Sequence, residues 1–145
     1  MTTTFKRYFI SGHLDLEPST FSEKYETKIR DAAAEDGGCA SFVVGDARGT
    51  DTFAQDLLNE LGVERDRVLV YHIGEQPRNN KHNWPTRGGF RSDSQRDAAM
   101  TEDSTHDILY FRTEEEAREL YGDAYKPRVS GTQKNENRRL AKSKK

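Results

Sequence analysis

The sequence predicts an α/β fold, a Rossmann-like three-layer sandwich in which helices cover a mainly parallel sheet. Three observations support this fold class. Short apolar runs rich in β-branched and aromatic residues alternate with segments whose apolar residues recur at helical spacing. The connections between these segments are short, and several contain glycine. At 145 residues, the chain has room for one hydrophobic core.

The first half of the chain shows this alternation in order. A strand over Tyr8–Ile10 precedes a helix that begins at Pro18 and ends at Gly37–Gly38. A second strand over Ser41–Val44 and a third over Val68–Ile73 flank another helix. The apolar stripes that predict the two helices are Phe21, Tyr25, Ile29 and Ala32 in the first and Phe53, Ala54, Leu57, Leu58 and Leu61 in the second.

The second half is less regular. Residues 74–91 lack periodicity, so we predict a loop, in which Trp84 and Phe90 either form a lid over a ligand or cover a small core. A helix from Ser92 to Met100 and a strand over Ile108–Phe111 follow. The remaining predictions are a helix from a Thr113–Glu116 capping box to Gly122, a helix after Ser130-Gly131-Thr132, one domain over residues 1–142 and a flexible basic tail over 143–145.

The composition predicts a cytoplasmic, soluble protein. Mean hydropathy is -1.00, and no apolar stretch approaches the roughly 20 residues that a membrane helix requires. The N-terminus has no signal-peptide hydrophobic region. The lone Cys39 rules out an intramolecular disulfide framework and fits a reducing compartment.

The charge is unevenly distributed along the chain. Residues 131–145 contain six basic residues against one acidic residue, whereas the rest of the chain carries a net charge of -7. A basic tail on an acidic body is one pattern of nucleic-acid contact. However, phosphate backbones require a basic face, and therefore nucleic-acid binding is disfavoured.

Glycine-containing turns point to a phosphate ligand. We expect three such turns, Ser11-Gly12-His13, Gly45 to Asp51 and Ser130-Gly131-Thr132, each between a strand-like run and a helix start. In a parallel sheet these turns meet at one edge, where helix N-termini present unpaired N–H groups to anions. The turns match neither the dinucleotide G-x-G-x-x-G nor the P-loop pattern, which disfavours a dehydrogenase or a P-loop NTPase.

The order of these motifs resembles the SLOG (SMF/DprA–LOG) superfamily, in particular its small YspA-like branch. The resemblance rests on residues 42–51, Gly88-Gly89-Phe90, residues 96–101, and Ser130-Gly131-Thr132 with Asn135. It implies a Rossmann-like fold, a nucleotide or nucleotide-derived ligand at the Gly-rich loops, and a homo-oligomer. The chain lacks the P-G-G-x-G-T motif, with its following Glu, of the LOG enzymes, which cleave the base from a nucleoside monophosphate.

Candidate site residues follow from these turns. For catalysis we select Asp15 and Asp46, because chemistry at a glycosidic carbon uses two carboxyl groups, with His13 as a hydrogen-bond donor or acid–base group. An Asp at the position of Asp51 is more often a helix cap than a catalyst, and Arg96 is as well suited to pair with Asp97 as to bind a ligand. The predicted ligand-binding residues are Ser11, Gly12, Gly45, Arg48, Gly49, Thr50, Asp51, Arg91, Arg96, Ser130, Gly131, Thr132 and Asn135.

Two functions of different kinds remain from the sequence. The first is an enzyme that hydrolyses the N-glycosidic bond of a nucleotide, and the second is a non-catalytic nucleotide or second-messenger sensor or sponge. No cofactor is expected, and no metal site, since the histidines lack the spacing of a closed ligand set.

Overall fold

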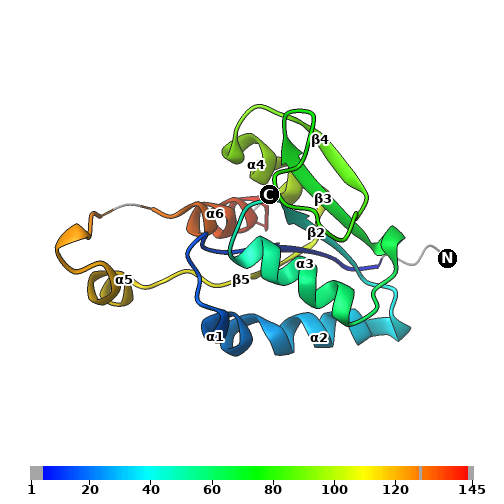
Figure 1. Cartoon of the computed structure of the whole chain (residues 1–145), viewed down its shortest axis with the longest axis horizontal. Helices are drawn as coiled ribbons and strands as arrows, with labels where there is room; N and C mark the ends of the chain where they lie inside the picture. Colours follow the sequence, from blue (N-terminus) through cyan, green and yellow to red (C-terminus); the bar gives the residue numbers. More distant parts are fainter. Residues whose placement is uncertain (1–4, 128, 144–145) are drawn as a thin grey trace.

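The computed structural model describes residues 5–127 and 129–143, and its centre is a five-stranded sheet (Figure 1). The strand order is β4-β3-β2-β1-β5, and every neighbouring pair is parallel. The predicted α/β class is therefore confirmed. The strands are β1 (Arg7–Ser11), β2 (Ser41–Gly45), β3 (Val68–Ile73), β4 (Thr86–Phe90) and β5 (His106–Leu109).

Helices cover both faces of this sheet. The predicted first helix is a nearly continuous rod in which a π-helical turn separates two α-helical pieces. The helical elements are α1 (Pro18–Phe21), η1 (Ser22–Glu26), α2 (Thr27–Ala34), η2 (Glu35–Gly37), α3 (Thr50–Glu60), η3 (Arg65–Arg67), α4 (Asp93–Asp103), α5 (Glu114–Tyr121), η4 (Gly122–Ala124) and α6 (Gly131–Ser143).

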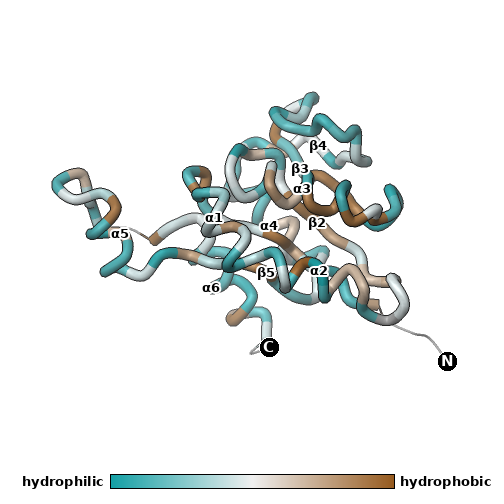
Figure 2. The backbone as a smooth tube through the Cα atoms, turned by 60° about the horizontal axis from the view of Figure 1, so that its bottom comes forward, coloured by the Kyte–Doolittle hydropathy of each residue, from teal (hydrophilic) through white to brown (hydrophobic). Residues whose placement is uncertain are grey.

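The two faces of the sheet bury different amounts of apolar surface. On the first face, alternate residues of β1, β2 and β3 pack against α1, α2 and α3 in one large cluster that includes Ile10, Ile29, Phe42 and Leu58. On the second face, a small cluster of Phe9, Val43, Tyr71 and Met100 lies under α4. In Figure 2 the backbone is mainly brown along β2 and mainly teal around β4.

Several sequence predictions are confirmed with small shifts of boundary. The strands over 8–10, 41–44 and 68–73 and the helices on the two apolar stripes are present. Ser92 caps α4 by accepting a hydrogen bond from the Gln95 N–H, and Thr113 and Glu116 form the predicted capping box of α5.

The segment 74–91 is not entirely a loop, because it contains β4. This strand pairs with β3 through a register irregularity and is exposed along most of its length. An exposed edge strand needs no alternation of apolar and polar residues, which explains why its Thr-Arg-Gly-Gly-Phe sequence gave no strand signal. Trp84 is not a lid: it is buried in the large apolar cluster, and Phe90 stacks on Tyr71.

Three further predictions need correction. β5 ends at Leu109, two residues before the predicted end, because pairing with β1 stops at Ser11. The turn at Ser130 follows the segment after η4 and not a strand. Ser143 is the last residue of α6 and not part of a tail, whereas residues 144–145 of the predicted tail lie outside the described residues.

Within the described part of the chain, no helix has the length and apolar character needed to cross a bilayer.

Candidate functional site

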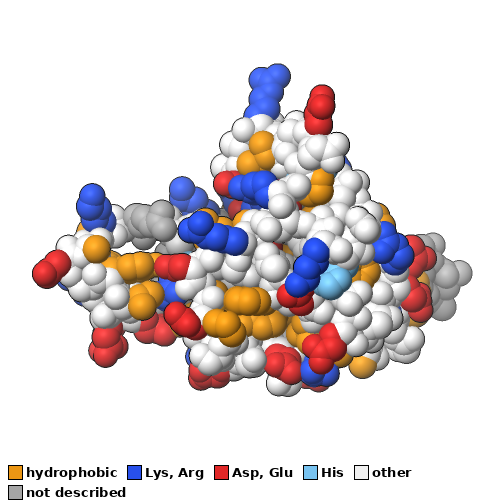
Figure 3. All heavy atoms as spheres, in the orientation of Figure 1, with side chains coloured by type: hydrophobic (Ala, Val, Ile, Leu, Met, Phe, Trp, Pro, Cys, Tyr) orange, Lys and Arg blue, Asp and Glu red, His pale blue; other side chains and the backbone are white. Residues whose placement is uncertain are grey.

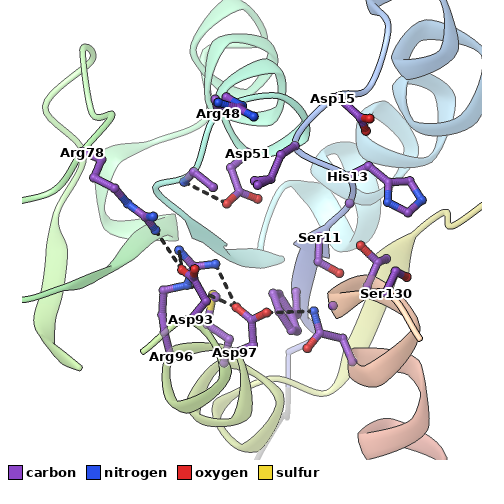
Figure 4. Close-up of a pocket in the computed structure, with 18 of the residues that line it drawn as sticks. Ser11, His13, Asp15, Arg48, Asp51, Arg78, Asp93, Arg96, Asp97 and Ser130 are labelled. Carbon is purple, nitrogen blue, oxygen red and sulfur yellow. Dashed lines mark hydrogen bonds and ion pairs between the residues drawn. The ribbon is translucent and has the colours of Figure 1, made fainter. Parts of the chain in front are cut away.

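A cavity of about 430 Å³ lies beside the carboxyl ends of β1 and β2, between the N-termini of α3 and α6 and the side of α4 (Figure 4). This is the edge at which open parallel sheets bind ligands. The cavity walls include nine of the predicted site residues in addition to Asp15 and His13, namely Ser11, Gly12, Arg48, Asp51, Arg96, Ser130, Gly131, Thr132 and Asn135.

The turn after β1 is held rigidly by two buried hydroxyl groups. The Tyr25 hydroxyl donates to the Ser11 carbonyl (2.6 Å) and accepts from the Tyr110 N–H (2.9 Å), which ties the ends of β1 and β5 together. Thr50 donates to the His13 carbonyl from its backbone N–H (3.2 Å) and from its hydroxyl (3.0 Å). A Cβ on Gly12 would collide with both hydroxyl-bearing side chains, so glycine is required there.

Ser11 lies in the cavity wall with an unused hydrogen-bonding group. Its side chain is 6% exposed, and its Oγ has no hydrogen-bond partner within the described residues. Buried hydroxyl groups are nearly always paired, by protein, water or ligand. A polar group placed in the cavity, from water or from a ligand, would complete the hydrogen bonding of this Oγ.

The turn after β2 places the N-terminus of α3 and the Arg48 side chain at the same cavity. Gly49 has φ of 77°, and a Cβ there would collide with the Leu14 carbonyl, so the two turns pack directly against each other. Among the described residues, no side chain caps α3 at Gly49, although the Thr50 N–H donates to the His13 carbonyl. Arg48 is exposed at the cavity wall, and no ion pair involves its guanidinium among residues 5–127 and 129–143.

Asp46 is an anchor for two arginines and does not line the cavity. Its carboxylate is fully buried and accepts from the Arg78 N–H (2.7 Å), Arg78 Nη2 (2.9 Å) and Arg96 Nη1 (2.9 Å). Burial raises the pKa of this carboxyl, but the bonds and charge of Arg78, with the charge of Arg96, outweigh burial and lower it. A carboxylate saturated in this way is a positioning group for the cavity wall.

A second set of polar contacts joins α4 to α6 across the cavity floor. Arg96 donates from Nη2 to Asp97 Oδ1 (3.0 Å), and Asn135 donates from Nδ2 to Asp97 Oδ2 (3.3 Å). Arg138 donates in turn to Asn135 Oδ1 (2.6 Å). Figure 4 shows Arg78 and Arg96 converging near Asp93 while Asp97 points toward α6.

Two carboxyl groups of the cavity hold protons more tightly than usual. Burial raises the pKa of Asp51 to about 7, against the opposing charge of Arg96, and the nearby Asp97 carboxylate adds to the increase. Burial also raises the pKa of Asp97, although Arg96 and Asn135 oppose it. With a pKa of about 7, Asp51 is able to donate a proton near neutral pH.

The two other predicted catalytic residues are held by neighbouring side chains. Burial raises the pKa of Asp15, but hydrogen bonds from Tyr121 and Arg112 outweigh it and lower the pKa. His13 Nε2 accepts a hydrogen bond from the Arg112 backbone N–H (2.9 Å), which assigns the proton of a neutral ring to Nδ1. Asp15 and His13 thus line the cavity, but the Asp15 carboxylate already accepts hydrogen bonds from Arg112 and Tyr121, and His13 Nε2 accepts one from the Arg112 N–H.

The remaining predicted residues lie just outside the cavity wall. Gly45, Asp46, Gly49 and Thr50 shape the turns behind it, and Arg91 is exposed elsewhere, with its N–H donating to Gln95. Sequence reasoning missed Arg78 and Tyr121, which line the cavity. Arg78 lies in an aperiodic loop and Tyr121 at a helix end, and neither position carries a periodic or motif signal.

No group of three metal-ligating side chains occurs among the residues that the structure describes. Comparison of the chain with family models, with curated proteins and with solved structures gives no match. The fold and the site geometry are therefore the basis of the functional argument.

Proposed function

We propose that the protein binds a nucleotide or nucleotide-derived ligand in the cavity between α3, α4 and α6. Three features that line one cavity carry this proposal: the N-terminus of α3, which has no side-chain cap among the described residues, Arg48, which forms no ion pair among them, and the Ser11 Oγ, which has no hydrogen-bond partner among them. The cavity volume of about 430 Å³ falls within the range of small-molecule sites.

The phosphate is assigned to the α3 end of the cavity. The helix N-terminus supplies partial positive charge, and Arg48 supplies a full charge with several N–H donors. At the other end, the Thr132 hydroxyl on α6 is suited to a sugar or a base, beside an Asn135 amide that already bonds Asp97 and Arg138. This polarity matches a molecule that is anionic at one end and polar but uncharged at the other.

Hydrolysis of the N-glycosidic bond is the second candidate function, and the two cavity carboxyl groups favour it. One of these carboxyl groups would protonate the departing base and the other would accept a proton from water, and Asp51, with a pKa of about 7, is able to do either near neutral pH. In this reaction the bond from the sugar carbon to the base nitrogen breaks, and a bond from that carbon to water oxygen forms. A sensor or sponge would bind the same ligand and leave this bond intact.

Nucleic-acid binding has less support. Three basic side chains of α6 are already engaged by the body of the protein: Arg138 donates to Ser94, Arg139 to Asp107, and Lys142 to the Glu102 carbonyl. Arg139 and Lys142 are in addition paired with the carboxylates of Asp107 and Glu102, and paired charges contribute little to the release of counterions that drives such binding.

Thermal unfolding with a panel of nucleoside mono-, di- and triphosphates, followed by chromatography of the same mixtures, tests the proposal. A ligand at 100 times its Kd adds about 2.7 kcal/mol of stability, and hence a shift of several degrees. Ligand recovered unchanged identifies a binding protein, whereas free base identifies a hydrolase. No shift and no product with any nucleotide would refute the proposal.

Arg48→Ala is the decisive variant. We expect it to weaken nucleotide binding about 10- to 100-fold, since a hydrogen bond to a charged group contributes about 1.5–3 kcal/mol. Arg30→Ala, which removes an exposed arginine on α2, is the matched control and should bind as the unmodified protein does. Equal loss of affinity in both variants would contradict the assigned phosphate position. If the protein is a hydrolase, Asp51→Asn should retain binding and abolish product formation.

A further inference from the structure

A second cavity of about 730 Å³ adjoins the first. It lies between α5, residues 125–127 and 129–130, and the start of α6, and the two cavities share His13, Tyr121 and Ser130 as wall residues. The proposed nucleotide site uses the first cavity alone. The second is therefore additional space that opens from the same sheet edge.

The walls of the two cavities differ in chemistry. The first is lined by carboxylates and guanidinium groups, with few apolar side chains. Six of the 13 residues that line the second cavity are aromatic or apolar, and its polar lining includes Arg112, Glu114 and Lys126. Its apolar wall consists of Phe111, Ala117, Tyr121, Tyr125, Pro127 and Val129.

The arm that carries α5 forms the outer wall of this cavity and packs little against the body. None of the residues of α5 is buried, and Leu120, Tyr121 and Val129 are 53%, 39% and 47% exposed. Hydrophobic side chains on this arm are visible at the left of Figure 3. Arg118 lies over the Tyr125 ring at 4.6 Å, and so one ring is already held in place by a cation.

Tyr121 marks the boundary between the two cavities. Its hydroxyl donates to Asp15 and accepts from Arg112 Nη1 (3.1 Å), which fixes the ring where both cavities meet. A group that leaves the first cavity past His13 and Ser130 therefore meets an aromatic wall directly.

Resting on the proposed function, we propose that the ligand is bipartite: a nucleoside diphosphate whose distal phosphate carries a second ring, as in a dinucleotide or a sugar nucleotide. The nucleotide occupies the charged cavity, and the second ring occupies the aromatic cavity. Flat rings and sugar faces gain from stacking on aromatic side chains, a gain that a phosphate alone cannot make. The second ring should therefore add affinity that the diphosphate alone does not have.

The test compares two matched pairs of probes by calorimetry: ADP with NAD, and UDP with UDP-glucose. Within the pair that carries the preferred base, we expect the ring-bearing probe to bind about tenfold tighter or more. Equal binding of both members of each pair would overturn the inference and leave the proposed function standing. Binding of no probe would overturn both.

Ala117→Trp fills the second cavity from α5 without touching the first. We expect it to remove the advantage of the ring-bearing probe and to leave the affinity for the diphosphate unchanged. Ala141→Trp, on the exposed side of α6 and in the lining of neither cavity, is the matched control. Tyr125→Ala, which removes a ring instead of filling space, should lower the affinity for the ring-bearing probe alone. Equal loss for both probes in Ala117→Trp and Tyr125→Ala would overturn the assignment of the second ring to this cavity.

Discussion

The two faces of the sheet are built differently. The face under α1, α2 and α3 buries a continuous apolar cluster that draws on three strands and three helices. The face under α4 and α6 buries four hydrophobic side chains and, around them, the chain of contacts from Arg78 through Asp46, Arg96 and Asp97 to Asn135. From this difference we infer that the face under α1, α2 and α3 supplies most of the stability, whereas the face under α4 and α6 supplies the candidate site.

The largest effect that we expect comes from the apolar face. Leu58 is fully buried on α3, and Leu58→Ala should lower the free energy of unfolding by about 3 kcal/mol, because the change removes apolar contacts and leaves a cavity. Urea unfolding at low and high salt measures it, and the loss should be the same in both. The exposed Leu140 provides the control, since Leu140→Ala should change stability by less than about 0.5 kcal/mol. If the loss of unfolding free energy in Leu58→Ala depended strongly on salt, the face under α1, α2 and α3 would not be stabilised mainly by apolar burial.

The second effect, on the face that holds the candidate site, is a dependence of the unfolding free energy on pH. The pKa of Asp51 is about 7 in the folded protein and about 4 in an unfolded chain, so the protonated form favours folding. Its contribution is complete below pH 4 and is lost as pH rises through 7. Asp51→Asn stays neutral, and the variant should gain about 1–3 kcal/mol relative to the unmodified protein between pH 4 and pH 8. Urea unfolding across this range measures the gain, and a constant difference would show that Asp51 titrates normally.

The smallest effect concerns the attachment of α6. Arg139 donates to the Ser104 carbonyl (3.0 Å) and to Asp107 Oδ1 (3.0 Å), with both charged side chains mostly buried. We expect Arg139→Ala to cost about 1 kcal/mol, and we expect this cost to shrink as salt is added. Arg139→Lys should recover part of it. If Arg139→Ala lowered the unfolding free energy as much as Leu58→Ala does, the face under α4 and α6 would contribute as much to stability as the apolar face.

Periodicity and turn chemistry predicted the parts of the fold that depend on local signals. Phe21, Tyr25 and Ile29 sit on one helix face because they meet the sheet, and Thr113 with Glu116 caps α5 through bonds three residues apart. β4 was not predicted because it pairs with β3 through backbone hydrogen bonds, and an exposed edge strand needs no alternation of apolar and polar residues.

The candidate site was predicted where it depends on turns after strands and missed where it depends on tertiary contacts. Ser11, Gly12 and Arg48 follow strands and meet at the sheet edge, as expected. The role of Asp46 could not be predicted, since it depends on Arg78, which lies 32 residues away in an aperiodic loop. The raised pKa of Asp51 likewise arises from burial beneath neighbours that are distant in sequence.

The attachment of α6 has a consequence for the rate at which a ligand leaves. Among its described residues, the buried side chains are Thr132 and Asn135, both polar, so little apolar burial opposes opening of this helix alone. Amide hydrogens of α6 should therefore exchange with solvent through local opening, well before the strands β1 to β3 exchange. Because Ser130, Thr132 and Asn135 form one wall of the cavity, each opening event also removes that wall. Binding of the proposed ligand should therefore slow amide exchange in α6 before it does so elsewhere, and opening of this helix should raise the rate at which that ligand leaves.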